Sequence, residues 1–395
     1  MPSLRRSGPL LAALSAGLLL AGCGTSALTP HVVSGTSPAP TPPGAGSTPA
    51  GTARHVPAFT SIHMTDASHG WGVTATALLR TSDGGRTWTN ALTVPANTRS
   101  APLSAGFFGA SDAWVAVPDS GAITVYRTTD GGQTWEHTSL EISDPEPSVT
   151  ASPLEQPTDI TFIDPSHGWI WVSAGAGMGG EAGTLVATSD GGAHWAPVSV
   201  ARAPQGTLPA IPYLGIKSGF SFTSTTDGWM TILGTFRAPA ALYVTHDGGR
   251  TWMQKGLPSS VGNANVVGFS PLAGNETSGF SVLESQHGHL SLSVLPETHN
   301  TGSWRLGESL TAHSLGFFLS FADVSHGFAT DGNTMFATRD GGATWTSFSP
   351  NRSLDGVTQM DFVSPTVGFA IMPRANHGDL LLTTTDGGHT WTAVR

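Results

Sequence analysis

One eight-residue pattern, T-x-D-G-G-x-[TH]-W, recurs along the chain and constrains its fold more than any other feature. Intact copies begin at Thr81, Thr128, Thr188, Thr245, Thr338 and Thr384, and an altered copy ends at Trp304 with His299 and Asn300 in the Asp-Gly positions. A short motif that returns about every 40 to 60 residues is typical of stacked supersecondary units. The chain is therefore expected to be built from repeats.

Each copy has the composition of a tight hairpin turn. Its two glycines tolerate positive φ, so the chain can reverse direction between two strands. The aspartate can accept hydrogen bonds from N–H groups of the turn, the threonine adds a hydroxyl, and the tryptophan offers a large apolar surface to a neighbouring unit. We therefore assign a structural role in these turns to Asp83, Asp130, Asp190, Asp247, Asp340 and Asp386.

A second pattern precedes each hairpin: an apolar alternation, a polar turn, and a small residue followed by an aromatic one, as in Gly70-Trp71 and Gly168-Trp169. Each unit thus reads as four strands, and seven such units closing into a ring form a β-propeller. Residues 56–395 are predicted to be an all-β, seven-bladed propeller of four-stranded antiparallel blades. Either an N-terminal strand completes a blade, or the last blade is whole and packs against the first.

The tryptophans occupy fixed places in the repeat. Of the twelve, all but Trp171 end a hairpin motif or follow the turn into a second strand. Aromatic side chains at two fixed points of each unit suit packing between blades better than glycan binding, the alternative role for a series of tryptophans.

The hairpin copies resemble the Asp-box, or BNR, repeat of sialidases, sortilin-type receptors, xyloglucan-active glycosidases and the photosystem II assembly/stability factor family. The regular D-G-G-x-T-W copies with their preceding Gly-Trp pairs are most similar to bacterial lipoprotein relatives of the photosystem assembly factor. The resemblance covers nearly all of residues 56–395 and implies the propeller fold. It says little about function, because one fold hosts many kinds of site.

The first 55 residues are not expected to belong to the propeller. Arg5 and Arg6 precede an apolar run, Leu10 to Ala21, that is shorter than the roughly 20 residues needed to span a bilayer, so residues 1–22 read as a signal peptide. The Leu-Ala-Gly-Cys ending resembles a bacterial lipobox and implies that Cys23 is lipidated. The alternative is an ordinary signal peptide with an incidental cysteine.

The segment that follows is a predicted tether. Residues 23–55 consist mainly of Ser, Thr, Pro, Gly and Ala, with almost no charge, and such a segment buries too little apolar surface to fold. We expect a monomer held by its lipid at the extracytoplasmic face of the cell membrane. Cys23 is the only cysteine, which excludes an internal disulfide.

Charge and composition exclude several classes of function. A net charge of −10 argues against a nucleic-acid partner. No group of residues shows metal-ligand spacing, since His69, His167 and His326 belong to different units, and we expect neither a metal nor another cofactor.

The loops that vary between units can carry specificity. In an up-and-down blade the Asp-box turns share one face of the ring, and the loops of the opposite face differ from blade to blade. Candidate ligand-binding residues there are Met178, Glu181, Tyr213, Arg237, Arg374, His377 and Asp379. The alternative is that these are ordinary surface loops.

No complete catalytic set is recognisable. The stretch Phe236-Arg237-Ala238-Pro239 resembles the F-R-I-P of sialidases but differs in its third residue and in its position. The other residues of the sialidase catalytic set are not recognisable in the chain. We therefore expect a scaffold that binds a protein or glycan partner and is not an enzyme. The alternatives are a glycoside hydrolase or lyase acting on an extracellular polysaccharide, with Glu181, Asp379 and the acids between residues 141 and 155 as candidate carboxylates, and a purely structural surface protein.

Overall fold

The computed structural model describes residues 57–94, 103–119, 122–140, 156–177, 179–202, 211–235, 237, 239, 241–255, 279–286, 289–296, 308, 310–311, 318–323, 325–374 and 378–395. The signal peptide, the lipidated Cys23 and the tether lie outside these residues and stay predictions, and so do the candidate roles of Met178 and His377. Within the described ranges, no helix has the length and apolar character that a membrane crossing requires.

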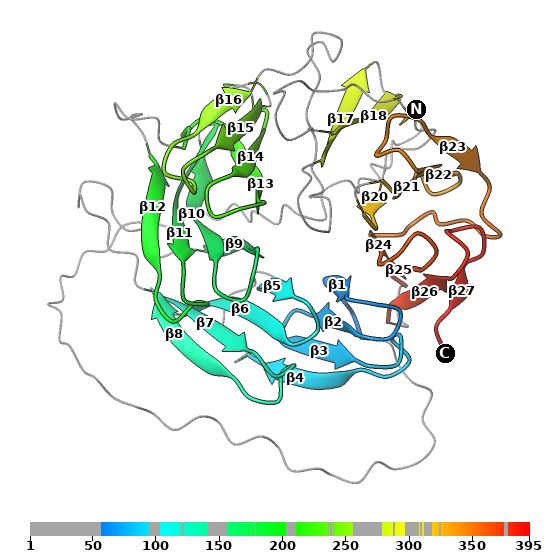
Figure 1. Cartoon of the computed structure of the whole chain (residues 1–395), viewed down its shortest axis with the longest axis horizontal. Coiled ribbons are helices and arrows are strands. Elements are labelled where there is room, and N and C mark those ends of the chain that lie inside the picture. Colours follow the sequence, from blue (N-terminus) through cyan, green and yellow to red (C-terminus); the bar gives the residue numbers. More distant parts are fainter. Residues whose placement is uncertain are drawn as a thin grey trace, which may run out of the picture.

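Four-stranded antiparallel sheets stand around a ring, and each is made of consecutive strands (Figure 1). The first three consist of β1 (Ser61–Met64), β2 (Gly70–Val73), β3 (Ala77–Thr81) and β4 (Thr89–Thr93); of β5 (Ser104–Phe108), β6 (Asp112–Asp119), β7 (Ala122–Thr128) and β8 (Glu136–Leu140); and of β9 (Gln156–Phe162), β10 (Gly168–Gly177), β11 (Gly180–Thr188) and β12 (Ala196–Ala201). The others consist of β13 (Ile216–Phe222), β14 (Gly228–Leu233), β15 (Ala241–Thr245) and β16 (Met253–Lys255); of β20 (Phe318–Phe321), β21 (Gly327–Thr330), β22 (Met335–Thr338) and β23 (Thr346–Phe348); and of β24 (Gln359–Phe362), β25 (Gly368–Met372), β26 (Leu380–Thr384) and β27 (Thr392–Ala393).

The prediction of seven four-stranded blades is wrong. The described residues form six such blades, and between β16 and β20 they form a sheet of only three strands, β17 (Gly279–Gln286), β18 (His289–Pro296) and β19 (Leu310–Thr311). In this unit the second pattern runs from Val266 to Gly279-Phe280 and predicts a further strand, but the stretch from Val266 to residue 278 lies outside the described residues.

The sequence of this unit departs from the repeat in two ways. Nine residues separate Phe269 from Gly279, whereas five separate Met64 from Gly70 in the first unit. Its box also lacks the Asp-Gly pair, and with it the carboxylate and the glycine that close the other hairpins. The unit that breaks the blade count is thus the one with the weakest local turn signals.

The ring is closed by packing between the first and last blades, which lie side by side (Figure 1). Each of these two blades consists of its own consecutive strands, so the last blade is whole among the described residues. Three backbone N–H groups at the start of the first blade donate to side chains of the last: Phe59 to Asp379 at 2.6 Å, Ile62 to Gln359 at 2.8 Å, and Met64 to Asp361 at 2.9 Å.

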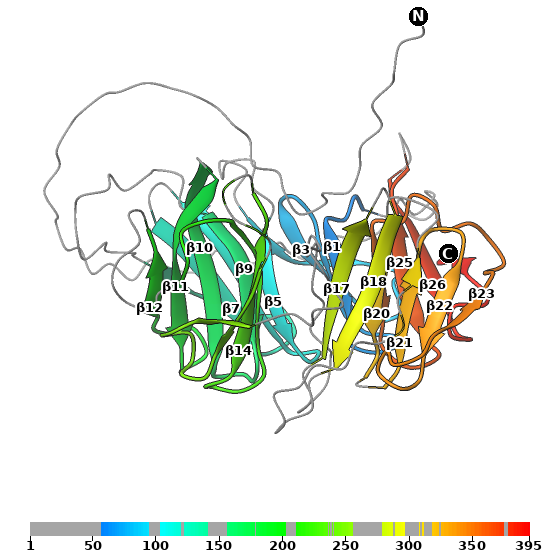
Figure 2. The ribbon, with the colours of Figure 1, turned by 90° about the horizontal axis from the view of Figure 1, so that it is seen from above.

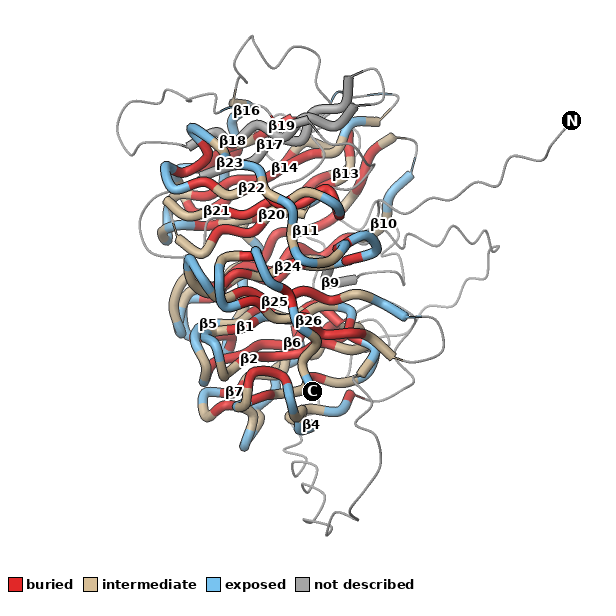
Figure 3. The backbone as a smooth tube through the Cα atoms, turned by 90° about the vertical axis from the view of Figure 1, so that its right-hand side faces the viewer, coloured by how far each residue is buried: buried red, intermediate tan, exposed pale blue. Residues whose placement is uncertain are grey.

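Aromatic side chains hold neighbouring blades together. Trp114 on β6 stacks on Phe162 on β9 with ring centroids 3.5 Å apart, and its indole N–H donates to the Gly191 carbonyl of the next Asp-box at 2.7 Å. Trp169 stacks in the same way on Phe222 of the following blade, at 3.8 Å. Buried residues follow the strands, while exposed residues gather at the turns (Figure 3). Trp114 and Trp169 thus serve in packing between blades.

Candidate functional site

Each described Asp-box is a closed network of hydrogen bonds. In the first, Asp83 accepts hydrogen bonds from the Thr81 hydroxyl at 3.0 Å and from the Thr87 N–H at 2.8 Å, while the Gly85 N–H donates to the Thr81 oxygen at 2.9 Å. The two glycines adopt φ values of 72° and 83°, which side chains disfavour. The turn thus engages its own carboxylate, as a structural element would.

The same bonds keep the box aspartates ionised. Burial tends to raise the pKa of Asp130, but hydrogen bonds from Thr134 and Thr128 outweigh it and hold the pKa at about 2. Hydrogen bonds from the backbone and ring of His194 lower the pKa of Asp190 to about 2, against a smaller effect of burial.

Three of the predicted ligand-binding residues come together at the far end of the β10–β11 hairpin. The Glu181 N–H donates to the Tyr213 carbonyl at 2.9 Å. The stem of Arg237 lies against Gly179, where an added Cβ would meet its side chain at 3.0 Å, and the Thr235 hydroxyl donates to the Gly179 carbonyl at 3.0 Å. Residues from two adjacent blades and the connection between them therefore form one structure.

Under this hairpin end lies a buried ion cluster that the sequence did not reveal. Glu181 and Lys217 are 5% and 7% exposed. The Glu181 carboxylate accepts the Lys217 backbone N–H at 2.6 Å and the Trp171 indole N–H at 3.2 Å. The Lys217 ammonium donates to the carbonyls of Glu181 at 2.9 Å and Tyr213 at 3.1 Å.

Burial acts on the ammonium group of this cluster. It lowers the pKa of Lys217 to about 8, although the neighbouring Glu181 carboxylate opposes the shift. The one sequence signal was scarcity, because Lys217 is one of only two lysines in the chain and stands in an apolar strand. The cluster clamps the hairpin end onto β13, and the candidate ligand role of Glu181 remains untested.

The other described candidates lie on the last blade, across the ring from β10 and β11 (Figure 1). Asp379 accepts the Phe59 N–H and thereby helps to close the ring. Arg374 is exposed at the end of β25. The structure therefore divides the predicted residues between two places, and only Glu181, Tyr213 and Arg237 share one.

Buried carboxylates on the first strands of blades were also missed. Asp159 on β9 accepts the Phe220 N–H of the next blade at 2.6 Å, and burial raises its pKa to about 6 against that bond. Burial likewise raises the pKa of Asp361 and lowers that of His63, while the attraction between the two opposes both shifts. In the sequence, an acidic residue within an otherwise apolar strand was the signal that could have revealed these buried carboxylates.

The described residues contain no group of three His, Cys, Asp or Glu side chains that could hold a metal ion. The expectation that the protein binds no metal therefore stays a prediction from the sequence.

Comparison with known proteins places the fold. Residues 55–151 match the family described as photosynthesis system II assembly factor YCF48. A solved structure described as YCF48 bound to D1 peptide is 18% identical with a TM-score of 0.53, over 84% of this chain and 92% of that one. YCF48 from Cyanidioschyzon merolae is 19% identical with the same TM-score of 0.53, over 85% of this chain and 95% of that one.

More distant propellers also match. A GH74 xyloglucanase from Xanthomonas campestris is 16% identical with a TM-score of 0.40, over 86% of this chain and 46% of that one, which is too remote to bear on function. A search of curated proteins found no match to the sequence. The chain is a BNR-type β-propeller similar to the photosystem II assembly factor, as the Asp-box resemblance implied.

Proposed function

We propose that this protein is a lipid-anchored, extracytoplasmic scaffold whose propeller binds a protein partner. The observation that carries the proposal is the similarity to YCF48, in sequence over residues 55–151 and in fold over most of the chain, because one YCF48 structure holds a D1 peptide. Lipidation at Cys23 and the tether of residues 23–55 would keep the propeller near membrane proteins.

The partner site in this proposal is the β10–β11 hairpin end with Tyr213 and Arg237. β10 and β11 are the longest strands described, at 10 and 9 residues, and β10 rises at one face of the ring (Figure 2). The hairpin end is exposed at Ala176 and Gly177, yet the Glu181–Lys217 cluster anchors its base. A hairpin with an anchored base loses less conformational freedom on binding than a free loop, which favours affinity.

The engagement of Glu181 and Asp379, the candidate carboxylates among the described residues, supports binding over hydrolysis. A two-carboxylate glycosidase needs one group free to act as an acid and another to act as a base or nucleophile, roughly 5 to 9.5 Å apart. Glu181 is buried and both its carboxylate oxygens accept hydrogen bonds. Asp379 accepts the Phe59 N–H in a blade across the ring.

The test is capture of the partner by the full lipidated chain in detergent extracts of its own membranes. Arg237→Ala should reduce a captured protein at least tenfold, whereas Arg374→Ala, the control on the distant blade, should retain it. Cys23→Ser should move the protein from the membrane to the soluble fraction. Equal capture by all variants would contradict the site. Turnover of a polysaccharide or chromogenic glycoside that Glu181→Gln abolishes would favour the hydrolase instead.

A further inference from the structure

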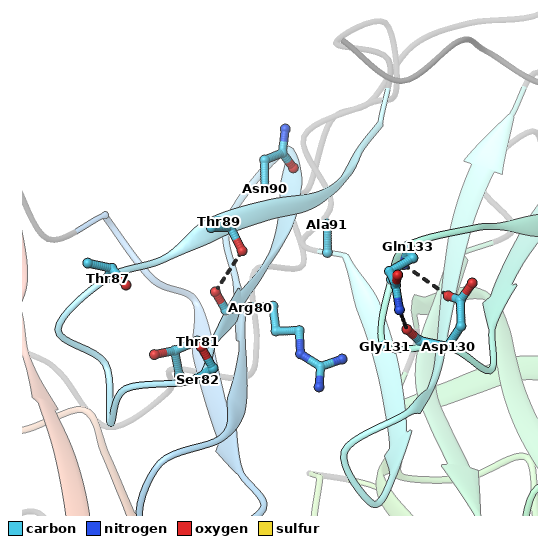
Figure 4. A pocket seen from close by; sticks show the side chains of 11 residues that line it. Arg80, Thr81, Ser82, Thr87, Thr89, Asn90, Ala91, Asp130, Gly131 and Gln133 are labelled. Carbon is cyan, nitrogen blue, oxygen red and sulfur yellow. Dashed lines mark hydrogen bonds between the residues drawn. The ribbon is translucent and has the colours of Figure 1, made fainter. Parts of the chain in front are cut away.

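A pocket of about 410 Å³ opens between the first two blades on the face that carries the Asp-boxes (Figure 4). One wall is the β3–β4 hairpin and the other is the tip of the second Asp-box. Its lining includes Arg80, Ser82, Thr89, Asn90, Asp130 and Gln133. The pocket belongs to turns that the repeat explains as architecture, and it is separate from the proposed partner site.

Arg80 is the cation of this pocket. It stands on β3, directly before the threonine of the first box, and its guanidinium lies 5.0 Å from the ring centroid of the buried Trp71. Its Nη1 occupies the space that a side chain at Gly131 would need, and Gly131 adopts a φ of 74°. The glycine of one blade thus admits the arginine of the other.

The guanidinium has hydrogen-bonding capacity to offer. Within the described part of the chain, no side chain or carbonyl accepts a hydrogen bond from it, and it forms no ion pair. The carboxylate of Asp130, which also lines the pocket, accepts hydrogen bonds from Thr128, Gln133 and Thr134. A guanidinium carries five N–H donors in a planar fork, and partly buried donors gain from an acceptor.

The remaining lining selects the kind of acceptor. Ser82, Thr89, Asn90 and Gln133 give the lining a polar character, and Ala91 is its one apolar side chain. The Thr89 hydroxyl donates to the Arg80 carbonyl and the Gln133 amide to the Asp130 carbonyl, while Asn90 points away from Arg80 (Figure 4) and its amide donates to the Thr93 hydroxyl. The guanidinium fork matches a carboxylate in two parallel hydrogen bonds, while amides and hydroxyls pair with sugar hydroxyls. A peptide would find little apolar surface, and the nearby Asp130 charge disfavours ligands with dense negative charge.

We propose that this pocket binds a uronic acid unit of an acidic polysaccharide, with the sugar carboxylate on Arg80 and a ring hydroxyl on the side-chain oxygen of Gln133. Through this site the protein would bind a carboxylated glycan at the face opposite its partner site. Because the two sites use different residues, loss of one leaves the other intact.

The chain offers a matched control at the equivalent position of the next blade. Arg127 directly precedes the threonine of the second box, as Arg80 precedes that of the first, and it lies against Gly191 of the third box. Its Nε is buried without a hydrogen-bond partner among the described residues. Arg127 does not line the pocket, so its replacement changes charge and packing between blades but not the proposed site.

The experiment is isothermal titration of the full chain in detergent with trigalacturonate, its methyl ester and an acidic tripeptide. Trigalacturonate should bind at least tenfold more tightly than either of the others. Arg80→Gln should weaken binding at least tenfold, and Arg127→Gln should leave it within twofold. Asn90→Asp, which keeps Arg80 over Trp71 but adds a negative charge at an exposed position, should also weaken binding at least tenfold.

Several results would overturn the proposal. These are failure of the unmodified chain to bind trigalacturonate, equal binding of the methyl ester, and an equal loss in Arg127→Gln. Tighter binding of the acidic peptide would assign the pocket to a protein ligand instead. Thermal unfolding of each variant shows whether it is folded. If Arg80→Gln does not fold, binding by Asn90→Asp decides the test.

Discussion

Removal of one box carboxylate, in Asp190→Ala, tests whether the turns are held by hydrogen bonds. Asp190 accepts the Thr188 hydroxyl at 2.9 Å and the His194 N–H at 2.9 Å, and its other oxygen lies 2.6 Å from the His194 ring Nδ1. Thr188 is 6% exposed, whereas the His194 side chain is 90% exposed. The substitution therefore leaves the buried Thr188 hydroxyl without its acceptor. The N–H and the ring of His194 also lose their acceptor, but water can reach the exposed His194.

The burial of each partner sets the magnitude. A buried group that loses its partner costs about 1–3 kcal/mol, while the exposed contacts of His194 contribute only a few tenths, because water replaces them. We expect Asp190→Ala to lower the free energy of unfolding by about 1–3 kcal/mol at pH 7. Because the folded-state pKa of Asp190 is lowered to about 2, its ionic contribution is present above about pH 4 and is lost as the pH falls toward 2.

Urea unfolding followed by tryptophan fluorescence measures the change, and an unaltered dependence on urea shows that the folded state is otherwise the same. Asp355→Ala is the control, since Asp355 is exposed and lies outside the boxes, and it should change stability by less than about 0.5 kcal/mol. An Asp190→Ala variant as stable as the unmodified protein at pH 7, or a difference in stability that persists unchanged to pH 2, would show that the Asp190 carboxylate does not hold the turn.

Three further outcomes are expected. Asp159→Asn should stabilise the protein at pH 7 and not below about pH 4, because burial raises the pKa of Asp159 to about 6 and the amide oxygen can still accept the Phe220 N–H; a loss of stability in urea at pH 7 would contradict this. Trp114→Ala should cost about 3–5 kcal/mol in the same assay, because the side chain is fully buried and stacked on Phe162; a loss below about 1 kcal/mol would contradict the packing role. Amide hydrogens of β17 and β18 should exchange faster than those of β10 and β11, because that unit lacks an intact box; slower exchange there would show that the box is dispensable.

Features that depend on neighbouring residues were predictable from the sequence. The turn of the third box needs Asp190, Gly191 and Gly192 within a few positions, and the structure gives these glycines φ values of 73° and 93°. The packing of Trp114 and Trp169 followed from their places in the repeat. The number of blades was not predictable in this way, because the altered box at His299-Asn300 and the long stretch before Gly279 carry weak turn signals.

The candidate site depends on distant residues, and the sequence revealed it only in part. Glu181 and Lys217 are 36 positions apart, and they meet because the end of the β10–β11 hairpin folds against β13. No local pattern encodes that approach, so Glu181 was noticed as a loop carboxylate and its partner was not. Arg80 was missed for a related reason, since only the fold of the ring brings it to the glycine of the next blade.

The missed side chains on first strands explain how the ring holds together without a shared strand. Polar groups on one blade accept a backbone N–H from the first strand of the next: Asp159 from Phe220 at 2.6 Å, Ser320 from Phe362 at 2.8 Å, Gln359 from Ile62 at 2.8 Å and Asp361 from Met64 at 2.9 Å. Unpaired strand edges otherwise invite association with other chains. Because each acceptor caps such an edge from the neighbouring blade, the junction between the last and first blades needs no strand exchange. Cohesion therefore resides in the strands and the Asp-box turns, which leaves the opposite loops free to differ and to carry recognition.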